Sequence, residues 1–288
     1  MRNKSTLFAA LGGALALVIG LAITAVHPAS AAEMIGNCEL YGKKGAIPMA
    51  PAKAGQLSVE TNLPSPGWWN GDTPETIKDG FEYCMAANIA HRAGLDKVDV
   101  VNVAWDALVA GQTHNFDLAL SQISITEERK KVVDFSIPYF SSDIGVLVKK
   151  GTKVDANSIR NMQIGVQGAT TGADFVDQKL KPSKPARVFP DQPSMFTALQ
   201  AGQIDIAMTD TSIILAQVAA SKGLFEVPGQ YKTGETYGAL YPKGWANAAT
   251  LDMIIKALID DGTLKKLSAK YLAAAWGSDP AKVPYFKY

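Results

Sequence analysis

The sequence predicts an α/β protein of two lobes, each a mostly parallel β-sheet flanked by helices. Residues 33–288 make a long stretch for one domain and suit two lobes, each with its own core. A strand, helix, strand alternation runs through residues 81–120 and returns through residues 163–208. Strands expected at 145–149 and 237–241 carry the chain between the halves, and two crossings make a hinge possible.

The first 32 residues have the pattern of a secretory signal peptide. Arg2 and Lys4 precede an apolar run over 7–26, and the small residues 29–32 follow as a cleavage site. The run is also long enough for a membrane anchor. Its Gly and Ala content and the adjacent small residues favour cleavage near the end of this segment, so we expect the chain outside the cytoplasm.

The sequence contains two cysteines, Cys38 and Cys84. In an exported chain such a pair is more often a disulfide than two free thiols, and two buried thiols are the alternative. A bridge would close a loop of 46 positions (84 minus 38), for which the chain-entropy model gives roughly 4 kcal/mol. Lipid modification of Cys38 is disfavoured because Asn37 precedes it.

The charge balance directs attention to a local site. Lys and Arg number 28 against 27 Asp and Glu, a formal charge of +1, so no basic face predicts nucleic-acid binding and no acidic tail predicts disorder. The sequence has no GxSxG or HExxH motif and no Cys or His cluster with metal spacing, which weakens hydrolase and metalloenzyme interpretations. We expect neither a metal nor a cofactor.

The first lobe is expected over residues 55–146, completed by 240–288. Residues 33–54 are rich in Gly, Pro, Ala and Lys without a period and are expected to form an extended arm. Periodicity and β-branched runs predict strands and helices in alternation, at 56–61 (strand), 81–93 (helix), 98–103 (strand), 105–110 (helix) and 116–120 (strand).

The loop at 63–72, LPSPGWWNGD, carries Trp68 and Trp69. Large aromatic side chains on a loop more often cover the edge of a core than a ligand. This loop, however, follows a strand end, where open α/β sheets bind their ligands. Both interpretations stay open at this point.

The second lobe is expected over residues 147–239, where the pattern of the first is repeated. The apolar residues of 248–275 have the spacing of helical faces broken at Gly262, and form the tail. The second-lobe elements are expected at 163–167 (strand), 171–180 (helix), 187–189 (strand), 194–201 (helix), 204–208 (strand) and 211–221 (helix).

The stretch at 116–139 is the most informative for chemistry. Ser121 and Ser124 stand at the end of a predicted strand, and Thr126 is a natural N-cap for the charged turn that contains Arg129. On residue pattern alone, Arg129 could pair with an acidic neighbour, Glu127 or Asp134, on a solvated face. Its place just beyond a strand end favours a ligand role.

Several motifs in the same order resemble the family 3 solute-binding proteins, the polar amino-acid receptors of ABC transporters. The resemblance covers about residues 55–275 and implies the two-lobe periplasmic-binding-protein-like fold of type II. Its motifs are SQISITEERKKVVDFSIPY (121–139), GFEYCMAANIAHRAGL (80–95), WDALVAGQTHNFDLAL (105–120), VQGATTGADF (166–175), DIAMTD (205–210) and TLDMIIKALIDDGTLKKLSAKYL (250–272).

The resemblance implies a site for the α-carboxylate of an amino acid. Arg129 would grip it with its guanidinium fork, helped by the backbone N–H groups of Ser124 and Thr171, with Ser121 nearby. Thr170 and Thr171 also open a predicted helix, whose free N–H groups and positive dipole end favour a carboxylate. Plain helix capping is the alternative role of these threonines, and the two roles are compatible.

The resemblance also implies a site for the α-ammonium. Asp210 would accept its hydrogen bonds, with the carbonyl of Gln122 and the hydroxyl of Ser124 completing the shell. On residue pattern alone, Asp210 is equally well explained as a helix cap. Because Arg129 belongs to the first lobe and Asp210 to the second, a bound zwitterion would bridge them and favour closure.

Trp68 and Trp69 would then form an apolar wall for the ligand side chain, with Gln167 and Phe140 as further candidates. The chain departs from the family here, because its tryptophan loop is longer than usual and Cys84 stands where the family often has Asp. Asn62 stands where receptors for basic amino acids tend to carry an acid, which argues against a cationic ligand side chain.

The resemblance implies a monomeric binding protein that closes on a free amino acid and delivers it to an ABC permease, without enzymatic activity and without nucleic acid. One alternative is a dehydratase of the same fold acting on prephenate-like or arogenate-like substrates, which needs an added acid or base. His91, His114, Glu82 and Asp143 are its unsupported candidates. A ligand sensor is the other alternative, since both functions use the same closed lobes.

Overall fold

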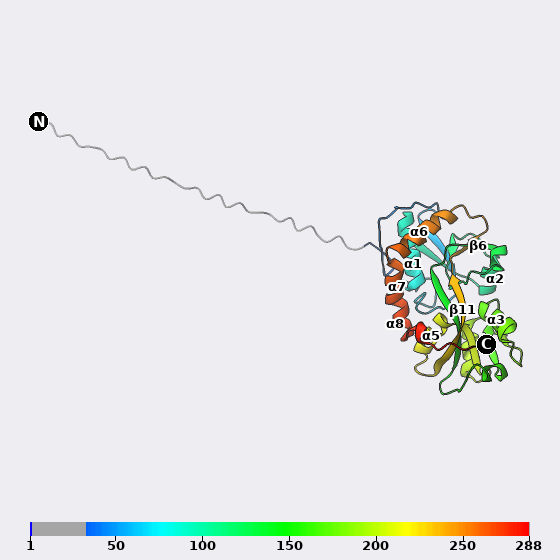
Figure 1. The fold of residues 1–288 in the computed structure, drawn as a ribbon. Coiled ribbons are helices and arrows are strands. Elements are labelled where there is room, and N and C mark those ends of the chain that lie inside the picture. The colour runs from blue at the N-terminus through cyan, green and yellow to red at the C-terminus, as the bar shows by residue number, and fades with distance from the viewer. Residues whose placement is uncertain (2–32, 288) are drawn as a thin grey trace. The chain divides into compact units, whose positions relative to one another are not determined.

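The computed structural model describes Met1 and residues 33–287, in which two β-sheets form two lobes (Figure 1). The signal peptide expected at 1–32 lies outside the described residues and stays a prediction. Within the described part of the chain, no helix is both long and apolar enough to cross a membrane. A short antiparallel pair, β1 (Met34–Ile35) and β2 (Cys38–Glu39), precedes the lobes.

The first lobe is built on a five-stranded sheet in the order β4, β3, β5, β12, β6. Strand β3 pairs in parallel with β4 and β5, whereas β12 is antiparallel to β5 and β6. Its elements are β3 (Gln56–Thr61), α1 (Phe81–Ala93), β4 (Lys97–Asn102), α2 (Trp105–Val109), β5 (Leu118–Ala119), the 3-10 turn η1 (Arg129–Lys131), β6 (Val133–Phe135), β12 (Leu240–Pro242), α6 (Ala248–Asp260), α7 (Thr263–Leu267) and the π-helical turn η4 (Ser268–Leu272).

The second lobe has a five-stranded sheet in the order β11, β7, β10, β8, β9. Strands β10, β8 and β9 are parallel neighbours, and β7 is antiparallel to both β10 and β11. Its elements are β7 (Phe140–Lys149), the 3-10 turn η2 (Ser158–Asn161), β8 (Ile164–Gln167), α3 (Thr171–Phe175), the π-helical turn η3 (Val176–Leu180), β9 (Arg187–Phe189), α4 (Gln192–Gln200), β10 (Ile206–Asp210), α5 (Thr211–Ala220) and β11 (Phe225–Tyr237).

Two short connections join the sheets. Residues 136–139 lead from β6 into β7, and residues 238–239 lead from β11 into β12. The sequence analysis expected the first crossing strand at 145–149, but β7 begins at Phe140 and lies wholly in the second sheet. Its early residues alternate between half-buried and exposed, so they lack the continuous apolar run by which buried strands are recognised.

The C-terminal segment makes a further connection that the sequence analysis did not anticipate. After α8 (Ala273–Trp276), the indole N–H of Trp276 donates to the Ser212 carbonyl at 2.7 Å. Past the 3-10 turn η5 (Pro280–Lys282), Tyr285 pairs with Gln230 of β11. The end of the 240–288 stretch, which was expected in the first lobe, therefore contacts the second.

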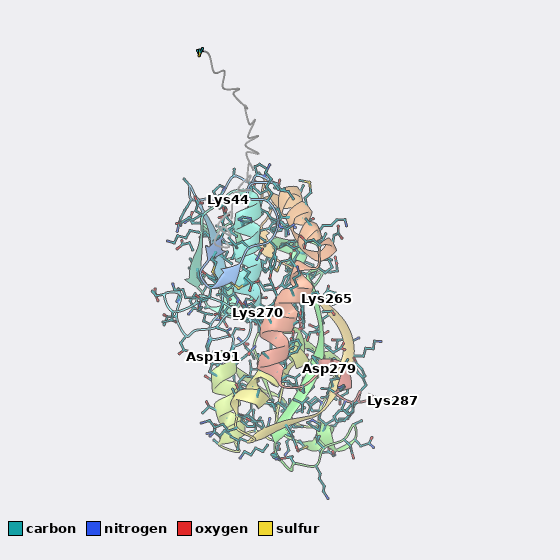
Figure 2. All side chains as sticks on the ribbon, turned by 90° about the vertical axis from the view of Figure 1, so that its left-hand side faces the viewer. Lys44, Asp191, Lys265, Lys270, Asp279 and Lys287 are labelled. Atoms are coloured by element: carbon teal, nitrogen blue, oxygen red, sulfur yellow. A yellow bond between two sulfur atoms is a disulfide. The ribbon has the colours of Figure 1, made fainter. Side chains whose placement is uncertain are left out.

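This course is visible in the figures. In Figure 1, α6, α7 and α8 follow one another along one side of the folded body, from the first sheet toward α5 of the second. Figure 2 shows the same path from Lys265 through Lys270 to Asp279 and Lys287. Three segments, not two, therefore connect the lobes.

Helix α1 is the centre of the first-lobe core. All of its residues are buried, because the sheet, α6, α7 and the N-terminal arm surround it. Gly80 precedes it with φ 120°, and a Cβ there would lie 2.4 Å from the Trp68 carbonyl oxygen. Only glycine fits at this position. The left-handed Gly94 ends the helix, as the sequence predicted.

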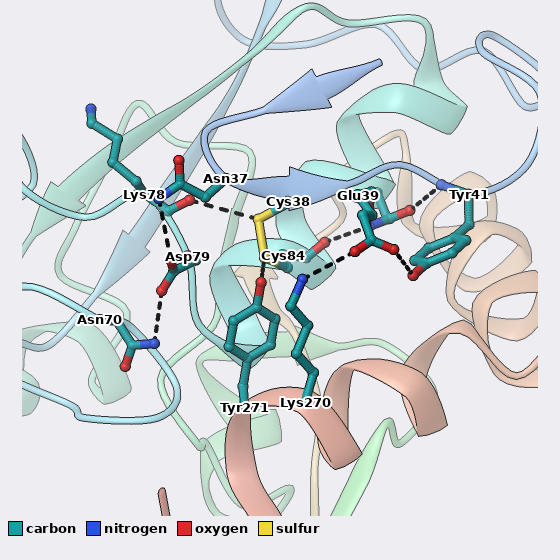
Figure 3. The surroundings of a disulfide bond; sticks show 11 residues. Asn37, Cys38, Glu39, Tyr41, Asn70, Lys78, Asp79, Cys84, Lys270 and Tyr271 are labelled. Atoms are coloured by element: carbon teal, nitrogen blue, oxygen red, sulfur yellow. Dashed lines mark hydrogen bonds and ion pairs between the residues drawn. A yellow bond between two sulfur atoms is a disulfide. The ribbon is translucent and has the colours of Figure 1, made fainter. Parts of the chain in front are cut away.

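The expected disulfide between Cys38 and Cys84 is present, with Cα atoms 5.3 Å apart (Figure 3). It ties the arm to α1, and the hydroxyl oxygen of Tyr271 lies 3.3 Å from Sγ of Cys84. Glu39, next to Cys38, also forms an ion pair with Lys270 at 3.2 Å. The extended arm is thus fastened to the first lobe by a covalent bond and by polar contacts.

Replacing both cysteines by serine should lower the free energy of unfolding by roughly 2 to 4 kcal/mol, since the bridge restricts a long loop of the unfolded chain. Urea unfolding monitored by circular dichroism would measure this. Wild-type protein in reducing agent should approach the variant. Equal midpoints for oxidised wild type and variant would contradict a stabilising role.

Candidate functional site

A cavity lies between the lobes at the carboxyl ends of their parallel strands. Strands β3 and β5 end on one side of it, and β8 and β10 end on the other. Ligands of open α/β sheets bind at such strand ends. Most of the side chains predicted for the ligand site line this cavity, namely Ser121, Gln122, Ser124, Arg129, Gln167, Thr170, Thr171 and Asp210.

Arg129 is buried at the cavity and is held by both lobes. Its Nη1 donates to the Ser124 carbonyl at 2.8 Å and its Nη2 to the Ala169 carbonyl at 2.9 Å, and its Cζ lies 5.2 Å from the centroid of the Trp105 ring. Burial lowers the pKa of Arg129, while the charge of Asp210 acts in the opposite direction. With five donors on a guanidinium, N–H groups remain for an anion.

The alternative of a solvated ion pair for Arg129 is not realised. Glu127 pairs with Lys130 at 2.8 Å and Asp134 with Lys243 at 2.8 Å, so both acidic neighbours have other partners. Arg129 is also buried. Among the described residues that line the cavity, it is the one basic residue and Asp210 is the one acidic residue.

Asp210, the last residue of β10, is buried and accepts a hydrogen bond from the Tyr237 hydroxyl. Burial, together with the charge of Glu235, raises the pKa of Asp210 to about 8, against the opposing effects of the Tyr237 hydrogen bond and the charge of Arg129. At neutral pH a large share of this carboxyl group is therefore protonated. A cationic group entering the cavity would favour its ionised form.

The alternative role of Asp210 as a helix cap receives no support from its contacts. It occupies the N-cap position of α5, but its side chain makes no capping hydrogen bond. Its carboxylate points instead to Tyr237. Because Asp210 and Arg129 shift each other's pKa through their charges, they lie close enough to act on the same guest.

Thr170 and Thr171 make different contacts, although the sequence analysis expected helix capping and ligand binding from both. Thr170 caps α3, since its hydroxyl accepts from the Ala173 N–H at 3.1 Å and donates to the Gln167 carbonyl at 2.7 Å. Thr171 is the first residue of α3 and its hydroxyl donates to Glu235 at 2.6 Å. The capping role thus belongs to Thr170.

Comparison with known proteins decides the family. Residues 72–274 match the family of bacterial extracellular solute-binding proteins, family 3. The chain belongs to this family.

Individual family 3 relatives cover much of the chain. It is 30% identical over 202 residues to the L-cystine-binding protein TcyJ of Escherichia coli strain K12, covering 68% of this chain and 74% of that protein. It is 30% identical over 260 residues to a probable histidine-binding protein of Neisseria gonorrhoeae, covering 86% and 94%. These ligands are those of the relatives.

Solved family 3 structures confirm the two-lobe fold. An ancestral arginine-binding protein bound to glutamine superposes with a TM-score of 0.69 at 28% identity, covering 76% of this chain and 98% of that one. The arginine-, lysine-, histidine-binding protein ArtJ of Geobacillus stearothermophilus gives 0.67 at 27% identity, covering 78% and 96%.

The aromatic wall predicted for this family 3 protein does not lie where the sequence suggested. Trp68 and Trp69 are buried in the first-lobe core at 1% and 0% exposure, and neither lines the cavity. Phe140 lies beside Trp68 with ring centroids 5.0 Å apart and is also outside the lining. The cavity aromatic is Trp105, whose indole N–H donates to the Ala169 carbonyl at 3.1 Å.

For Trp69, the reason is a hydrogen bond to a buried carboxylate. Glu82 of α1, fully buried, accepts from the Trp69 indole at 2.8 Å, from the Gln122 backbone N–H at 2.9 Å and from the Tyr139 hydroxyl. Burial raises the pKa of Glu82. The same carboxylate fixes Gln122, at φ 49°, at the cavity edge. Trp105 lies two residues beyond the predicted strand at 98–103, a signal the sequence analysis did not use.

Asp210→Asn should stabilise the unliganded protein at pH 7.5 by up to about 5 kcal/mol. The folded pKa of Asp210, about 8, exceeds its ordinary value of 3.8, so ionisation destabilises the folded state as pH rises from about 4 to 8. Asparagine removes this effect, and the gain should shrink at pH 5. Urea unfolding at both pH values would measure it.

Asp260→Asn is the matched control, because Asp260 is an exposed acid on α6, and it should leave stability nearly unchanged at both pH values. An Asp210→Asn protein no more stable than wild type at pH 7.5 would contradict the assigned cost of the buried charge.

Proposed function

We propose that this chain binds a free α-amino acid between its lobes outside the cytoplasm and delivers it to an ABC importer in the membrane. The observation that carries the proposal is the placement of Arg129 from the first lobe and Asp210 from the second on one cavity. The binding proteins for cystine and histidine among its relatives support the same class of ligand.

The two charges suit a zwitterion. A buried charge needs an opposite charge and hydrogen bonds to offset its desolvation, and an α-amino acid carries one charge of each sign at neighbouring atoms. In the proposed complex Arg129, with the N–H groups of Ser124 and Thr171, meets the carboxylate. Asp210, with the Gln122 carbonyl, meets the ammonium. Ser121 and Gln167 complete the polar lining, and Trp105 takes the role expected of Trp68 and Trp69.

Closure follows from the same geometry. The ligand would contact residues of both lobes only when the lobes are together, so its binding free energy favours the closed form. The connections at 136–139 and 238–239 act as the hinge. The lobe boundaries near residues 147 and 239, cleavage of the leader, and a monomeric state belong to this proposal.

The proposed function is binding without catalysis. None of the described residues lining the cavity is a histidine. His91 is buried on α1, where Nε2 lies 3.0 Å from the Gly42 carbonyl oxygen, and Glu82 is committed to Gln122, Trp69 and Tyr139. A sensory role would use the same closed form, and growth of a deletion strain on the bound amino acid as nitrogen source would separate uptake from sensing.

Calorimetric titration of the purified protein with the twenty amino acids and L-cystine tests the proposal. At least one should bind, and Arg129→Ala should weaken it by roughly 3 to 5 kcal/mol because the ligand carboxylate would be buried unpaired. Lys130→Ala, an exposed neighbour, is the control and should bind like wild type. No heat with any of them, or turnover of prephenate, would overturn the proposal.

Binding should also release a proton. Asp210 has a pKa of about 8 without ligand, and the α-ammonium would lower it, so affinity should rise by up to roughly tenfold per pH unit between about pH 6 and 8. Arg129, Glu235 and Tyr237 are the other titratable groups facing it, and burial holds the pKa of Tyr237 well above 10.

The measurement is calorimetry at pH 6.5 in phosphate and in Tris, whose protonation heats differ. The observed binding enthalpies should differ between buffers for wild type and agree for Asp210→Asn. Equal enthalpies for wild type would show that Asp210 keeps its protonation state on binding.

A further inference from the structure

Glu235 is a carboxylate beside the cavity that neither lines it nor was expected from the sequence. It lies near the end of β11, after a register shift in which Tyr231 pairs with Ile144 and Glu235 with Ser142. Such a bulge re-aims the side chains that follow it. Here it brings Glu235, half-buried, to the junction of the two sheets.

One carboxylate oxygen of Glu235 accepts a hydrogen bond from a hydroxyl group of each lobe. Its Oε2 lies 2.6 Å from Oγ of Ser124, which follows β5 in the first lobe, and 2.6 Å from Oγ1 of Thr171, which begins α3 in the second. Its Oε1 accepts from the Thr233 hydroxyl at 3.0 Å. The carboxylate therefore joins the lobes through two residues that line the cavity.

The direction of these hydrogen bonds has a chemical consequence. A hydroxyl has one proton to donate and two lone pairs that accept. Since Ser124 and Thr171 both give their proton to Glu235, they present only lone pairs to the cavity. Lone pairs attract an ammonium and do not bind a carboxylate. Ser121 differs, because its Oγ accepts from the Asn62 N–H at 3.1 Å and its proton remains available.

The charge of Glu235 also favours a cationic group in the cavity. It raises the pKa of Asp210 and opposes the lowering of the pKa of Arg129 by burial. Asp174 is a further acid whose charge acts on Arg129. An entering ammonium would interact favourably with the charge of Glu235 and favour the ionised form of Asp210, which a ligand without an ammonium cannot do.

We propose that Glu235 is a positioning residue that holds the lobes together without ligand and turns the Ser124 and Thr171 hydroxyls into acceptors, which makes an α-ammonium a requirement for the guest. This inference rests on the proposed amino-acid binding for its ligand part. Its lobe-joining part stands on the unliganded protein alone.

Glu235→Gln tests the ligand part, because a glutamine amide can donate to the two hydroxyl oxygens and free their protons to turn to the cavity. L-glutamine and L-histidine are titrated by calorimetry beside their deaminated counterparts, glutaramic acid and imidazolepropionic acid. The preference of wild type for the amino form should fall by about tenfold or more in the variant. The pH range over which affinity rises should also move to lower values.

Glu226→Gln is the matched control. Glu226 lies on the same strand and accepts from the Gly151 N–H at 2.9 Å, within the second lobe, so its loss should change neither preference nor pH range. An unchanged preference in Glu235→Gln would overturn the ligand part of the proposal.

Small-angle scattering of the unliganded protein tests the lobe-joining part. Glu235→Gln and Glu235→Asp, whose shorter side chain cannot reach both hydroxyls, should each show a larger radius of gyration than wild type and Glu226→Gln. Equal radii in all four proteins would overturn it. If Glu235→Gln fails to fold, Glu235→Asp, which keeps the charge, decides both measurements.

The two levels of failure are distinguishable. Wild type that binds none of the twenty amino acids or L-cystine defeats the proposed function, while the scattering comparison still decides whether Glu235 joins the lobes. Wild type that binds an amino acid, with Glu235→Gln behaving identically in every measurement, defeats only the role of Glu235.

Discussion

The burial of Arg129 between two lobes is the constraint on which the rest of the site depends. A guanidinium removed from water loses hydration that must be replaced, and the carbonyls of Ser124 and Ala169, with the face of Trp105, replace part of it. One of these carbonyls belongs to each lobe. Arg129 can therefore make both of these hydrogen bonds only when the lobes are together. Its remaining N–H groups can donate to an anion that fits between the lobes.

The acids around the cavity do not hold Arg129 in a permanent ion pair. No described acid forms a salt bridge with Arg129. Asp210 faces Tyr237, and Glu235 faces three hydroxyls. A fixed ion pair would compete with a guest, whereas an Arg129 without one keeps N–H donors for an anion.

The first-lobe core shows how a site can be built from outside its lining. Glu82 does not touch the cavity, yet it holds Gln122 at the edge and draws Trp69 into the interior. The disulfide fastens the N-terminal arm to the same helix, and the C-terminal segment reaches across to the second sheet. The lobes are thus connected by more than the two strands a sequence pattern reveals.

Sequence alone determined what periodicity and local chemistry encode. Helix α1 has the predicted bounds because Gly80 and Gly94 mark its ends. Arg129 and Asp210 could be predicted to line one cavity because each follows or ends a strand in a motif that a family shares. Tertiary structure decided which way individual side chains point. Trp69 turned inward because Glu82 of α1 accepts its indole N–H, Trp68 packs against Phe81 and Phe140, and Glu235 reached the site through a bulge. The direction of a side chain and its contacts with residues far along the chain produce no periodic pattern in the sequence. They can therefore be seen only in the tertiary structure.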